Sequence, residues 1–250
     1  MVHTLQLIVF HSIKYQEADL LVYAYTHLYG RQTYLFRKAR TAHKHNVAAL
    51  IFPLSILEAE AYHKPGGKIQ HIKTIHQGAD LSRIRTDLHK SSIALFLGEL
   101  LYKSIKEEEA NLPLYQFLVE SIQALNDMEC SVANFHLYFL AQFCARLGYA
   151  PLPNYHPEHT PLFDITQGAF RSLQAKQEVS PHTTSDLLFS KEESRLLAQL
   201  SICSTPLEAA AIPLNGTQRH QFVTQMIRYL HYHLGGLPGM KSPEVLRQLF

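Results

Sequence analysis

Residues 50–76 read "LIFPLSILEAEAYHKPGGKIQHIKTIH", and this pattern favours two β-strands joined by a tight turn. The part before Lys64 predicts a long strand with an irregularity near Pro53. The Pro65-Gly66-Gly67 sequence that follows is a strong hairpin signal. The part after the turn alternates, so we expect Ile69, His71, Lys73 and Ile75 on one face of a strand and Gln70, Ile72 and Thr74 on the other.

Two further runs on the N-terminal side of this stretch are also typical of strands. They read "HTLQLIVFHSI" at residues 3–13 and "RQTYLFRK" at residues 31–38, and both are rich in β-branched and aromatic residues. Four or five strands within about 75 residues suit a small closed barrel, because closure removes the unpaired strand edges.

The pattern changes from strand to helix near Asp80. Apolar residues recur near the helical period of 3.6 in residues 83–105 and 112–125. Residues 132–148 are apolar on most sides, which predicts a buried central helix that ends at Gly148. Residues 150–189 contain five prolines and little periodicity, so we expect a long irregular excursion there.

Helical patterns return towards the end of the chain. Ser190 and Thr205 begin capping patterns with Glu193 and Glu208, and Pro206 stands at the favoured first helical position. A last helix is predicted over residues 217–234. We therefore predict a multi-domain α+β protein, with a barrel domain at residues 1–79 and a helical domain at residues 80–250.

Composition excludes several classes of protein. Apolar residues make up 46% of the 250 residues, which is too many for general disorder. The three cysteines form no CxxC pair, so neither a thiolate zinc site nor a disulfide scaffold is expected. No apolar run of 18 residues occurs, so we expect a soluble cytoplasmic protein without a membrane partner. GxSxG, HExxH, Walker and GxGxxG motifs are all missing, so none of these catalytic motifs indicates an enzyme.

Basic residues gather in a window that contains no acid. The net charge is only +2, yet nothing acidic occurs between Asp19 and Glu58. A solvated face normally mixes both signs, so this window indicates a polyanionic ligand. The cations of the window and the aromatic rings among them are candidate contacts to DNA: Arg31, Tyr34, Phe36, Arg37, Lys38, Arg40 and Lys44.

The aromatic residues of the window allow two interpretations. In single-stranded nucleic acid the bases need stacking planes and the phosphates need positive charge, and Tyr34 and Phe36 beside the cations would supply both. Alternatively, Tyr34, Leu35 and Phe36 are barrel core and the cations only decorate the exterior. The missing acids favour the binding interpretation.

The remaining titratable residues give weaker signals. His43 with His45, or His231 with His233, could chelate a metal, but no neighbouring acid or cysteine completes a site. His89, His136 and His220 are expected to be ordinary, partly buried helix residues. The acidic run 107–109 is expected in a solvated loop.

The basic last helix also allows two interpretations. Arg219, His220, Arg228, His231 and His233 make it a possible groove for an acidic peptide, although plain packing in a bundle is the favoured explanation.

Six segments in order resemble one protein family. They are "YQEADLLVYAYTHLYGRQTYLFRKAR" (15–40), "AALIFPLSILEAEAYHKPGGKIQHI" (48–72), "LFLGELLYKSI" (95–105), "FHLYFLAQFCARLGYAPLP" (135–153), "FSKEESRLLAQL" (189–200) and "IRYLHYHLGG" (227–236). In this order and spacing the chain resembles the RecO family of recombination-mediator proteins, in a variant that lacks zinc.

The resemblance implies a fold and a function. It implies an N-terminal OB-fold barrel, a helical domain, and a non-enzymatic protein without a cofactor. It implies binding to single- and double-stranded DNA, annealing of strands coated by single-strand-binding protein, and loading of RecA together with RecR. It also implies contact with the acidic C-terminal tail of single-strand-binding protein, and a place in the cytoplasm at the nucleoid.

The resemblance also assigns residues. The family's basic positions fall on Arg31, Arg37 and Arg40, to which charge alone adds Lys38 and Lys44. Glu17 and Asp19 fit the family's acidic pair, which we expect to cap backbone amides in the first turn.

One departure from the family concerns zinc. Many relatives carry four cysteines after the "LGY" segment, but residues 150–189 contain no cysteine, and His156, His159 and His182 lack zinc-ribbon spacing. We therefore expect packing to replace the metal, through Tyr155, Leu162, Phe163, Ile165 and Phe170.

Two other functions remain open at this stage. One is a protein-interaction scaffold whose barrel is only a docking platform. The other is an OB-type protein that binds RNA instead of DNA.

Overall fold

The computed structural model describes residues 2–39, 48–172, 187–237 and 239–250. Two compact units divide the chain, Met1–Met128 and Glu129–Phe250. The change from strand to helix after residue 77 therefore lies inside the first unit, which contains both the barrel and the first helices. Each unit is described by itself below.

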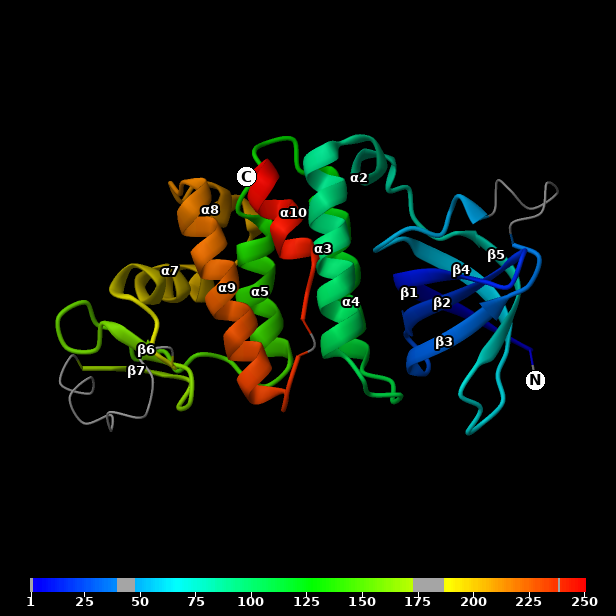
Figure 1. Ribbon diagram of the computed structural model, residues 1–250, viewed down its shortest axis with the longest axis horizontal. Helices are drawn as coiled ribbons and strands as arrows, with labels where there is room; N and C mark the ends of the chain where they lie inside the picture. Colours follow the sequence, from blue (N-terminus) through cyan, green and yellow to red (C-terminus); the bar gives the residue numbers. More distant parts are fainter. Residues whose placement is uncertain (1, 40–47, 173–186, 238) are drawn as a thin grey trace. The chain divides into compact units, whose positions relative to one another are not determined.

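Five strands of the first unit close into a barrel in the order β1-β2-β3-β5-β4 (Figure 1). The strands are β1 (Val2–Tyr15), β2 (Asp19–Thr26), β3 (Gly30–Phe36), β4 (Ile56–Tyr62) and β5 (Gln70–Gln77). Among the pairs of these five described strands, only β3–β5 is parallel. The predicted small barrel and the predicted hairpin between β4 and β5 are both confirmed.

The barrel core consists of the inward residues of all five strands. Because side chains alternate along a strand, paired positions in neighbouring strands face the same side. Val22 pairs with Tyr34, and Tyr34 pairs with Gln70, so these three side chains point inward. The core contains Leu5, Leu7, Val9, Val22, Ala24, Tyr34, Phe36, Ala39, Leu57, Ala59, Ala61, Ile72 and Ile75.

The alternation predicted for residues 69–75 is wrong at one point. Ala61 pairs with Ile72 and Glu60 with Thr74, so Lys73 is an extra residue in β5. This β-bulge reverses the alternation and turns both Ile72 and Ile75 into the core. Lys73 remains exposed, and its Nζ lies 2.9 Å from the Glu60 carboxylate.

The described residues of the first unit also form the helices α2 (Ser82–Thr86), α3 (Leu88–Ser104) and α4 (Leu112–Asp127). Asp87 caps α3 by accepting hydrogen bonds from the amides of His89 and Lys90, and Asn111 caps α4. The acidic run 107–109 lies between α3 and α4 with exposed side chains, which confirms the expected solvated loop.

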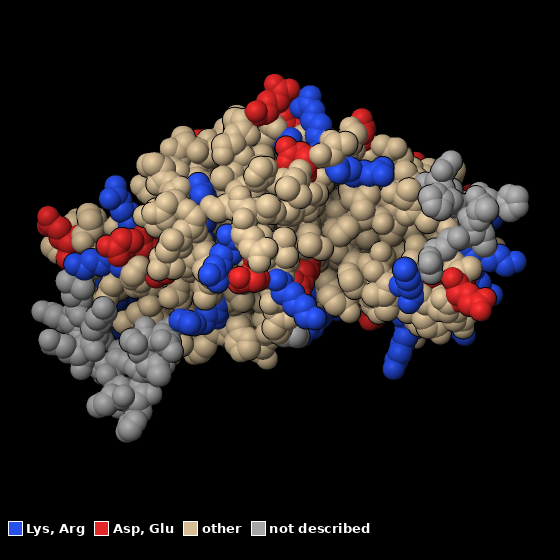
Figure 2. Space-filling model, turned by 45° about the horizontal axis from the view of Figure 1, so that its top comes forward, with Lys and Arg blue, Asp and Glu red and all other residues tan. Residues whose placement is uncertain are grey.

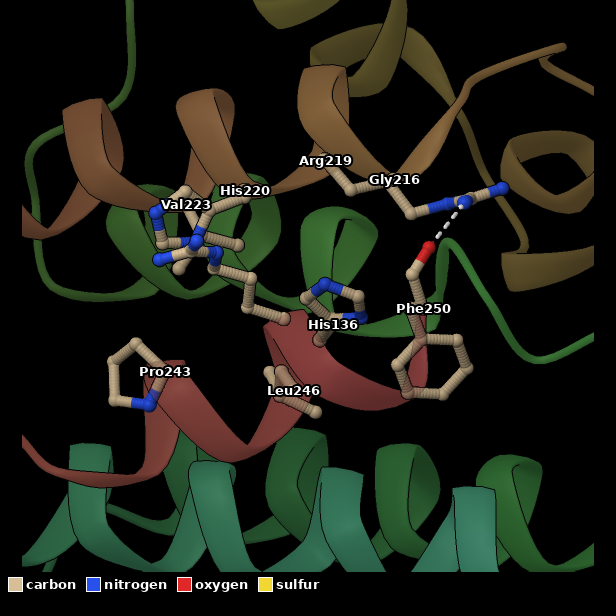
Figure 3. A pocket seen from close by; sticks show the side chains of 9 residues that line it. His136, Gly216, Arg219, His220, Val223, Pro243, Leu246 and Phe250 are labelled. Atoms are coloured by element: carbon tan, nitrogen blue, oxygen red, sulfur yellow. Dashed lines mark hydrogen bonds between the residues drawn. The ribbon is translucent and has the colours of Figure 1, made fainter.

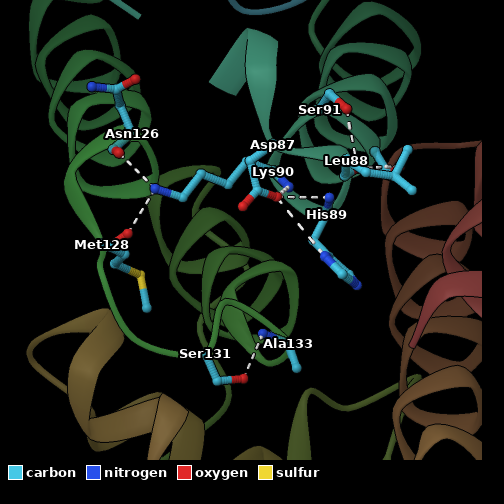
Figure 4. Close-up of polar contacts among 10 residues, drawn as sticks. Asp87, Leu88, His89, Lys90, Ser91, Asn126, Met128, Ser131 and Ala133 are labelled. Atoms are coloured by element: carbon cyan, nitrogen blue, oxygen red, sulfur yellow. Dashed lines mark hydrogen bonds and ion pairs between the residues drawn. The ribbon is translucent and has the colours of Figure 1, made fainter. Parts of the chain in front are cut away.

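A buried lysine ties α3 to the end of α4 (Figure 4). Lys90 is 5% exposed, and its Nζ donates to the carbonyl oxygens of Asn126 at 2.7 Å and Met128 at 2.6 Å. The carbonyl groups at a helix C-terminus have no partner within the helix and attract positive charge. Lys90 therefore satisfies the end of α4 and has a structural role.

The second unit is mainly helical, with α5 (Phe135–Arg146), α7 (Lys191–Ile202), α8 (Pro206–Ala210), α9 (Gly216–His233) and α10 (Ser242–Leu249). The predicted central helix is α5, and Phe139, Leu140 and Phe143 are among its buried residues. Both predicted capping patterns are present, as a capping box at Ser190 and as the Thr205 cap of α8. The sequence pattern did not predict α10.

The predicted irregular excursion contains a small two-stranded sheet, formed by β6 (Leu162–Asp164) and β7 (Ala169–Arg171). Phe163 is fully buried, with its ring centre 5.1 Å from that of Phe170 and 5.2 Å from that of Phe189. Leu162, Ile165 and Phe170 are buried as well, and Tyr155 packs on Phe170. These residues pack together as predicted.

A buried carboxylate holds the turn between β6 and β7. One Asp164 oxygen accepts hydrogen bonds from the Thr166 amide at 2.8 Å and the Thr166 hydroxyl at 2.7 Å. The other lies 2.9 Å from an Arg171 guanidinium nitrogen. Burial alone would raise the pKa of Asp164, but the bonds from Thr166 and Arg171 outweigh it and lower that pKa.

Among the described residues, no helix combines the length and the apolar character needed to cross a membrane.

Candidate nucleic-acid interface

The predicted contacts lie in three different environments. Arg37 and Lys38 directly follow β3, and both are exposed. Arg31 is half-buried at the start of β3, whereas Tyr34 and Phe36 point into the barrel. Arg40 and Lys44 lie outside the described residues.

The stacking role predicted for Tyr34 and Phe36 is wrong. Their exposed fractions are 0% and 1%, so neither ring offers a face to a base. The pairing of β3 with β2 and β5 turns both side chains into the barrel, where these large rings fill much of the core. Burial also raises the pKa of the Tyr34 phenol.

Arg31 holds the barrel against the segment after α3. Its guanidinium Nη1 donates to the Ile105 carbonyl at 2.7 Å and lies over the Tyr102 ring, with the guanidinium carbon 4.9 Å from the ring centre. Its backbone amide donates to the Glu107 carbonyl at 3.0 Å. Arg31 therefore has a structural role that the sequence analysis missed, and its contact with DNA stays a prediction.

The turn that carries Arg37 and Lys38 is fixed by a carboxylate. The Lys38 backbone amide donates to Asp19 Oδ1 at 2.8 Å, and the φ of Lys38 is 54°. A left-handed backbone is uncommon for a residue other than glycine, so this bond stabilises an otherwise unfavourable turn. Asp19 thus caps a backbone amide as expected, but this amide belongs to the turn after β3 and not to the first turn, where the sequence placed it.

A further cation lies at the same end of the barrel. Lys14 pairs with Leu20, and Leu20 pairs with Phe36, so Lys14 stands in the row of residues just before Arg37. Its side chain is exposed. Sequence analysis missed Lys14 because it lies outside the acid-free window, next to Glu17 and Asp19 in sequence. Strand pairing was the signal needed to find it. We call Lys14, Arg37 and Lys38 the basic edge.

The outside of β1, β2 and β3 forms a face that starts at the basic edge. His11 pairs with Tyr23 and Tyr23 with Thr33, and these residues point away from the core. Ile13 and Tyr15 follow on β1, with exposed fractions of 38% and 39%. We call His11, Ile13, Tyr15, Tyr23 and Thr33 the outer β face.

Basic side chains stand apart on the view in Figure 2, where uncharged surface separates most of them. Binding to a nucleic acid on such a surface depends on a few well-placed cations and on contacts of the face between them.

Comparison with known proteins identifies the family of this barrel and its helices. A family model described as the N-terminal part of recombination protein O matches residues 1–79, and one for its C-terminal part matches residues 85–243. The chain belongs to the RecO family. It is 34% identical to the DNA repair protein RecO of Flavobacterium psychrophilum over 244 residues, which is 97% of each chain. It is also 34% identical to that of Bacteroides fragilis over 245 residues.

The helical unit of this RecO-family chain holds a large apolar cavity. Its volume is about 620 Å³, and α5, α7, β7 and residues 150–155 line it. Leu152, Phe170 and Ile202 supply apolar surface, and Arg195 is the only charged residue among the described residues that line it. A cavity of this size and composition can hold the side chains of a short peptide.

Arg219, at the start of α9, stabilises the fold and does not line an open groove (Figure 3). Arg219 donates to the carbonyl oxygens of Leu214 at 2.7 Å and Phe250 at 3.2 Å, and to the side chain of Asn134 at 2.8 Å. The pocket beside it measures only about 10 Å³. Burial, together with nearby Arg219, lowers the pKa of His136 to about 3, so this ring is neutral. Packing therefore explains this end of α9.

In the described part of the chain, no group of three or more His, Cys, Asp or Glu side chains is placed to hold a metal ion. His231 accepts from the Leu237 amide at 3.0 Å, whereas His233 Nε2 lies 2.8 Å from the Ile165 carbonyl oxygen. These two rings thus face different partners. His136 is fully buried, and His89 is exposed. His43 and His45 lie outside the described residues.

Proposed function

We propose that this RecO-family chain is a non-enzymatic mediator of DNA repair and recombination. It binds single- and double-stranded DNA, anneals complementary strands coated by single-strand-binding protein, and helps RecR to load RecA. The observation that carries the proposal is the basic edge, where exposed Arg37 and Lys38 stand on a turn fixed by Asp19 at the end of a barrel strand.

Annealing has a simple physical basis at such an edge. Two DNA strands repel each other, and cations that neutralise phosphates lower this repulsion. Base pairing itself then selects the sequence, so the protein needs no base-specific hydrogen bonds. The basic edge therefore needs to supply only positive charge for the phosphates.

The acidic tail of single-strand-binding protein is the partner that we propose for the helical unit. The 620 Å³ cavity offers apolar surface for side chains, and Arg195 stands among its lining residues to pair with a carboxylate. Ile202, which is 80% exposed, extends the apolar surface. This assignment replaces the basic groove of the last helix that the sequence suggested, because Arg219 is engaged within the fold.

The proposal predicts a loss of DNA binding when the basic edge is reversed. The double variant Arg37→Glu, Lys38→Glu should bind a single-stranded oligonucleotide about tenfold more weakly or worse at low salt, because two phosphate contacts become repulsive. Fluorescence anisotropy with a labelled oligonucleotide measures the change.

A matched control uses the same change of charge elsewhere. Lys191 and Arg247 are exposed residues of the helical unit, and the double variant Lys191→Glu, Arg247→Glu should retain most of the affinity. Equal losses in the two double variants would remove the basic edge as the binding site. Competition between DNA and RNA oligonucleotides of one sequence separates a DNA mediator from an RNA-binding protein.

A further inference from the structure

We propose that three aromatic side chains on the outside of the barrel, His11, Tyr23 and Tyr102, form a base-stacking platform for single-stranded DNA. This inference rests on the proposed DNA-binding function and assigns the contact for the bases, whereas the basic edge is the contact for the phosphates.

The three rings come from different elements and meet in one cluster. His11 lies on β1, Tyr23 on β2 and Tyr102 on α3. The ring centres of His11 and Tyr23 are 6.1 Å apart and their planes differ by 16°. The Tyr102 ring centre lies 4.9 Å from that of Tyr23 and 5.4 Å from that of His11.

These rings are open to solvent, unlike the aromatic residues of the core. His11 is exposed, and Tyr23 and Tyr102 are half-buried. Two residues after Tyr23 on β2, Tyr25 stacks on Phe10, but these two rings are each only 1% exposed. The barrel core is complete without His11 and Tyr23, because both point away from it. A solvent-exposed ring cluster on a barrel supplies the flat apolar surface that unpaired bases stack on.

The platform is held in place before any ligand binds. The Arg31 guanidinium packs over Tyr102 and donates to the Ile105 carbonyl, which fixes the ring against the barrel. Such pre-organisation lowers the entropic cost of binding. Burial raises the pKa of the Tyr23 phenol, with a further contribution from Tyr102, so this ring carries no negative charge near neutral pH.

The charges around the platform suit a nucleic-acid strand. The Arg31 guanidinium is engaged with Tyr102 and Ile105 at one end of β3, whereas Arg37 is exposed just past the other end, about 20 Å away at the rise of a β-strand. Ile13 and Tyr15 continue the apolar surface from His11 towards the basic edge. A strand laid along the outer β face from the basic edge therefore meets the exposed cations first and the ring cluster beyond them. This complementarity identifies single-stranded DNA as the occupant.

Abasic oligonucleotides test the platform directly, because they keep the phosphates and lack the bases. The full chain should bind an ordinary thymidine oligonucleotide about tenfold more tightly than an abasic one of equal length, as expected for one stacked base. Tyr23→Leu should remove this preference and leave the affinity for the abasic oligonucleotide unchanged. Tyr23→Phe, which keeps the ring, should retain the preference.

Each outcome decides between the platform and its alternatives. Equal binding of both oligonucleotides by the unmodified chain, or a preference that survives in Tyr23→Leu, would overturn the platform while leaving the basic edge intact. If the double variant Arg37→Glu, Lys38→Glu loses binding to both oligonucleotides while the Tyr23 variants still bind, the proposed DNA-binding function is supported independently of the platform. If the unmodified chain binds neither oligonucleotide, the proposed function itself fails. Circular dichroism of each variant checks that the barrel has folded.

Discussion

Replacing Gly30 with alanine should lower the free energy of unfolding of the first unit, which contains the barrel, by about 3 kcal/mol. Gly30 has a φ of 60°, and a Cβ added there would lie within 3 Å of two backbone atoms of Glu109 and of the Glu107 carbonyl oxygen. Backbone atoms cannot move aside as a flexible side chain can. The loop after α3 would therefore be pushed away from β3.

The expected cost has two parts. A left-handed backbone costs about 1–2 kcal/mol for a residue with a Cβ. Displacing the loop also strains the bond from the Arg31 amide to Glu107 and the bond from its guanidinium to Ile105, which together contribute about 1–3 kcal/mol. Urea unfolding of the full chain, followed by circular dichroism, measures the change.

Gly66 provides a matched control for the backbone term. Its φ is 71°, and a Cβ added there would meet nothing within 4 Å. Gly66→Ala should therefore cost only about 1–2 kcal/mol, the conformational part alone. If Gly30→Ala and Gly66→Ala cost the same, the close approach of β3 to residues 107–109 would be unimportant for stability.

Asp164 should have a comparable effect on the helical unit. Asp164→Ala should cost about 2–4 kcal/mol, because the Thr166 amide and hydroxyl lose a buried charged acceptor and Arg171 loses its partner. Thermal unfolding at neutral pH measures the loss. Glu244→Ala is a suitable control, since it removes an exposed ion pair with Arg247 that should contribute less than about 1 kcal/mol.

The effect of Asp164 should also depend on pH. Its pKa is lower in the folded chain than the ordinary value of 3.8. The unfolded chain therefore takes up this proton first as the pH falls, and the stabilisation disappears through and below about pH 4. Above about pH 5 the difference in stability between the native chain and Asp164→Asn should be constant. A difference that grows on acidification would show that the folded carboxyl has a raised pKa.

Local patterns sufficed to predict many elements of the fold, although not α10 or the two short strands β6 and β7. The turn residues Pro65-Gly66-Gly67 marked the hairpin, and Ser190 with Glu193 marked the start of a helix, because these signals act between neighbours in sequence. The central helix was clear from its apolar residues. The resemblance to RecO rested on the same local segments, and the family comparison confirmed it.

Features that depend on pairing between distant residues could not be predicted. Neither face of the strand at residues 31–38 is purely apolar, so only its pairing with β2 and β5 shows that Tyr34 and Phe36 are core. The bulge at Lys73 likewise arises between β4 and β5. The role of Arg31 needs a carbonyl group 74 residues away. The charge pattern along the sequence indicated Arg37 and Lys38 but not Lys14. Strand pairing in the barrel brings Lys14 to the same end as these two residues.

The salt dependence of DNA binding tests the basic edge most directly. Affinity for a single strand falls with salt by about 0.7 log units per tenfold change for each phosphate contact. Replacing both Arg37 and Lys38 with alanine should therefore make the log–log slope shallower by about 1.4, while the Lys191→Ala, Arg247→Ala variant keeps the original slope. A slope that stays unchanged when Arg37 and Lys38 are removed would contradict binding of phosphates at this end of the barrel.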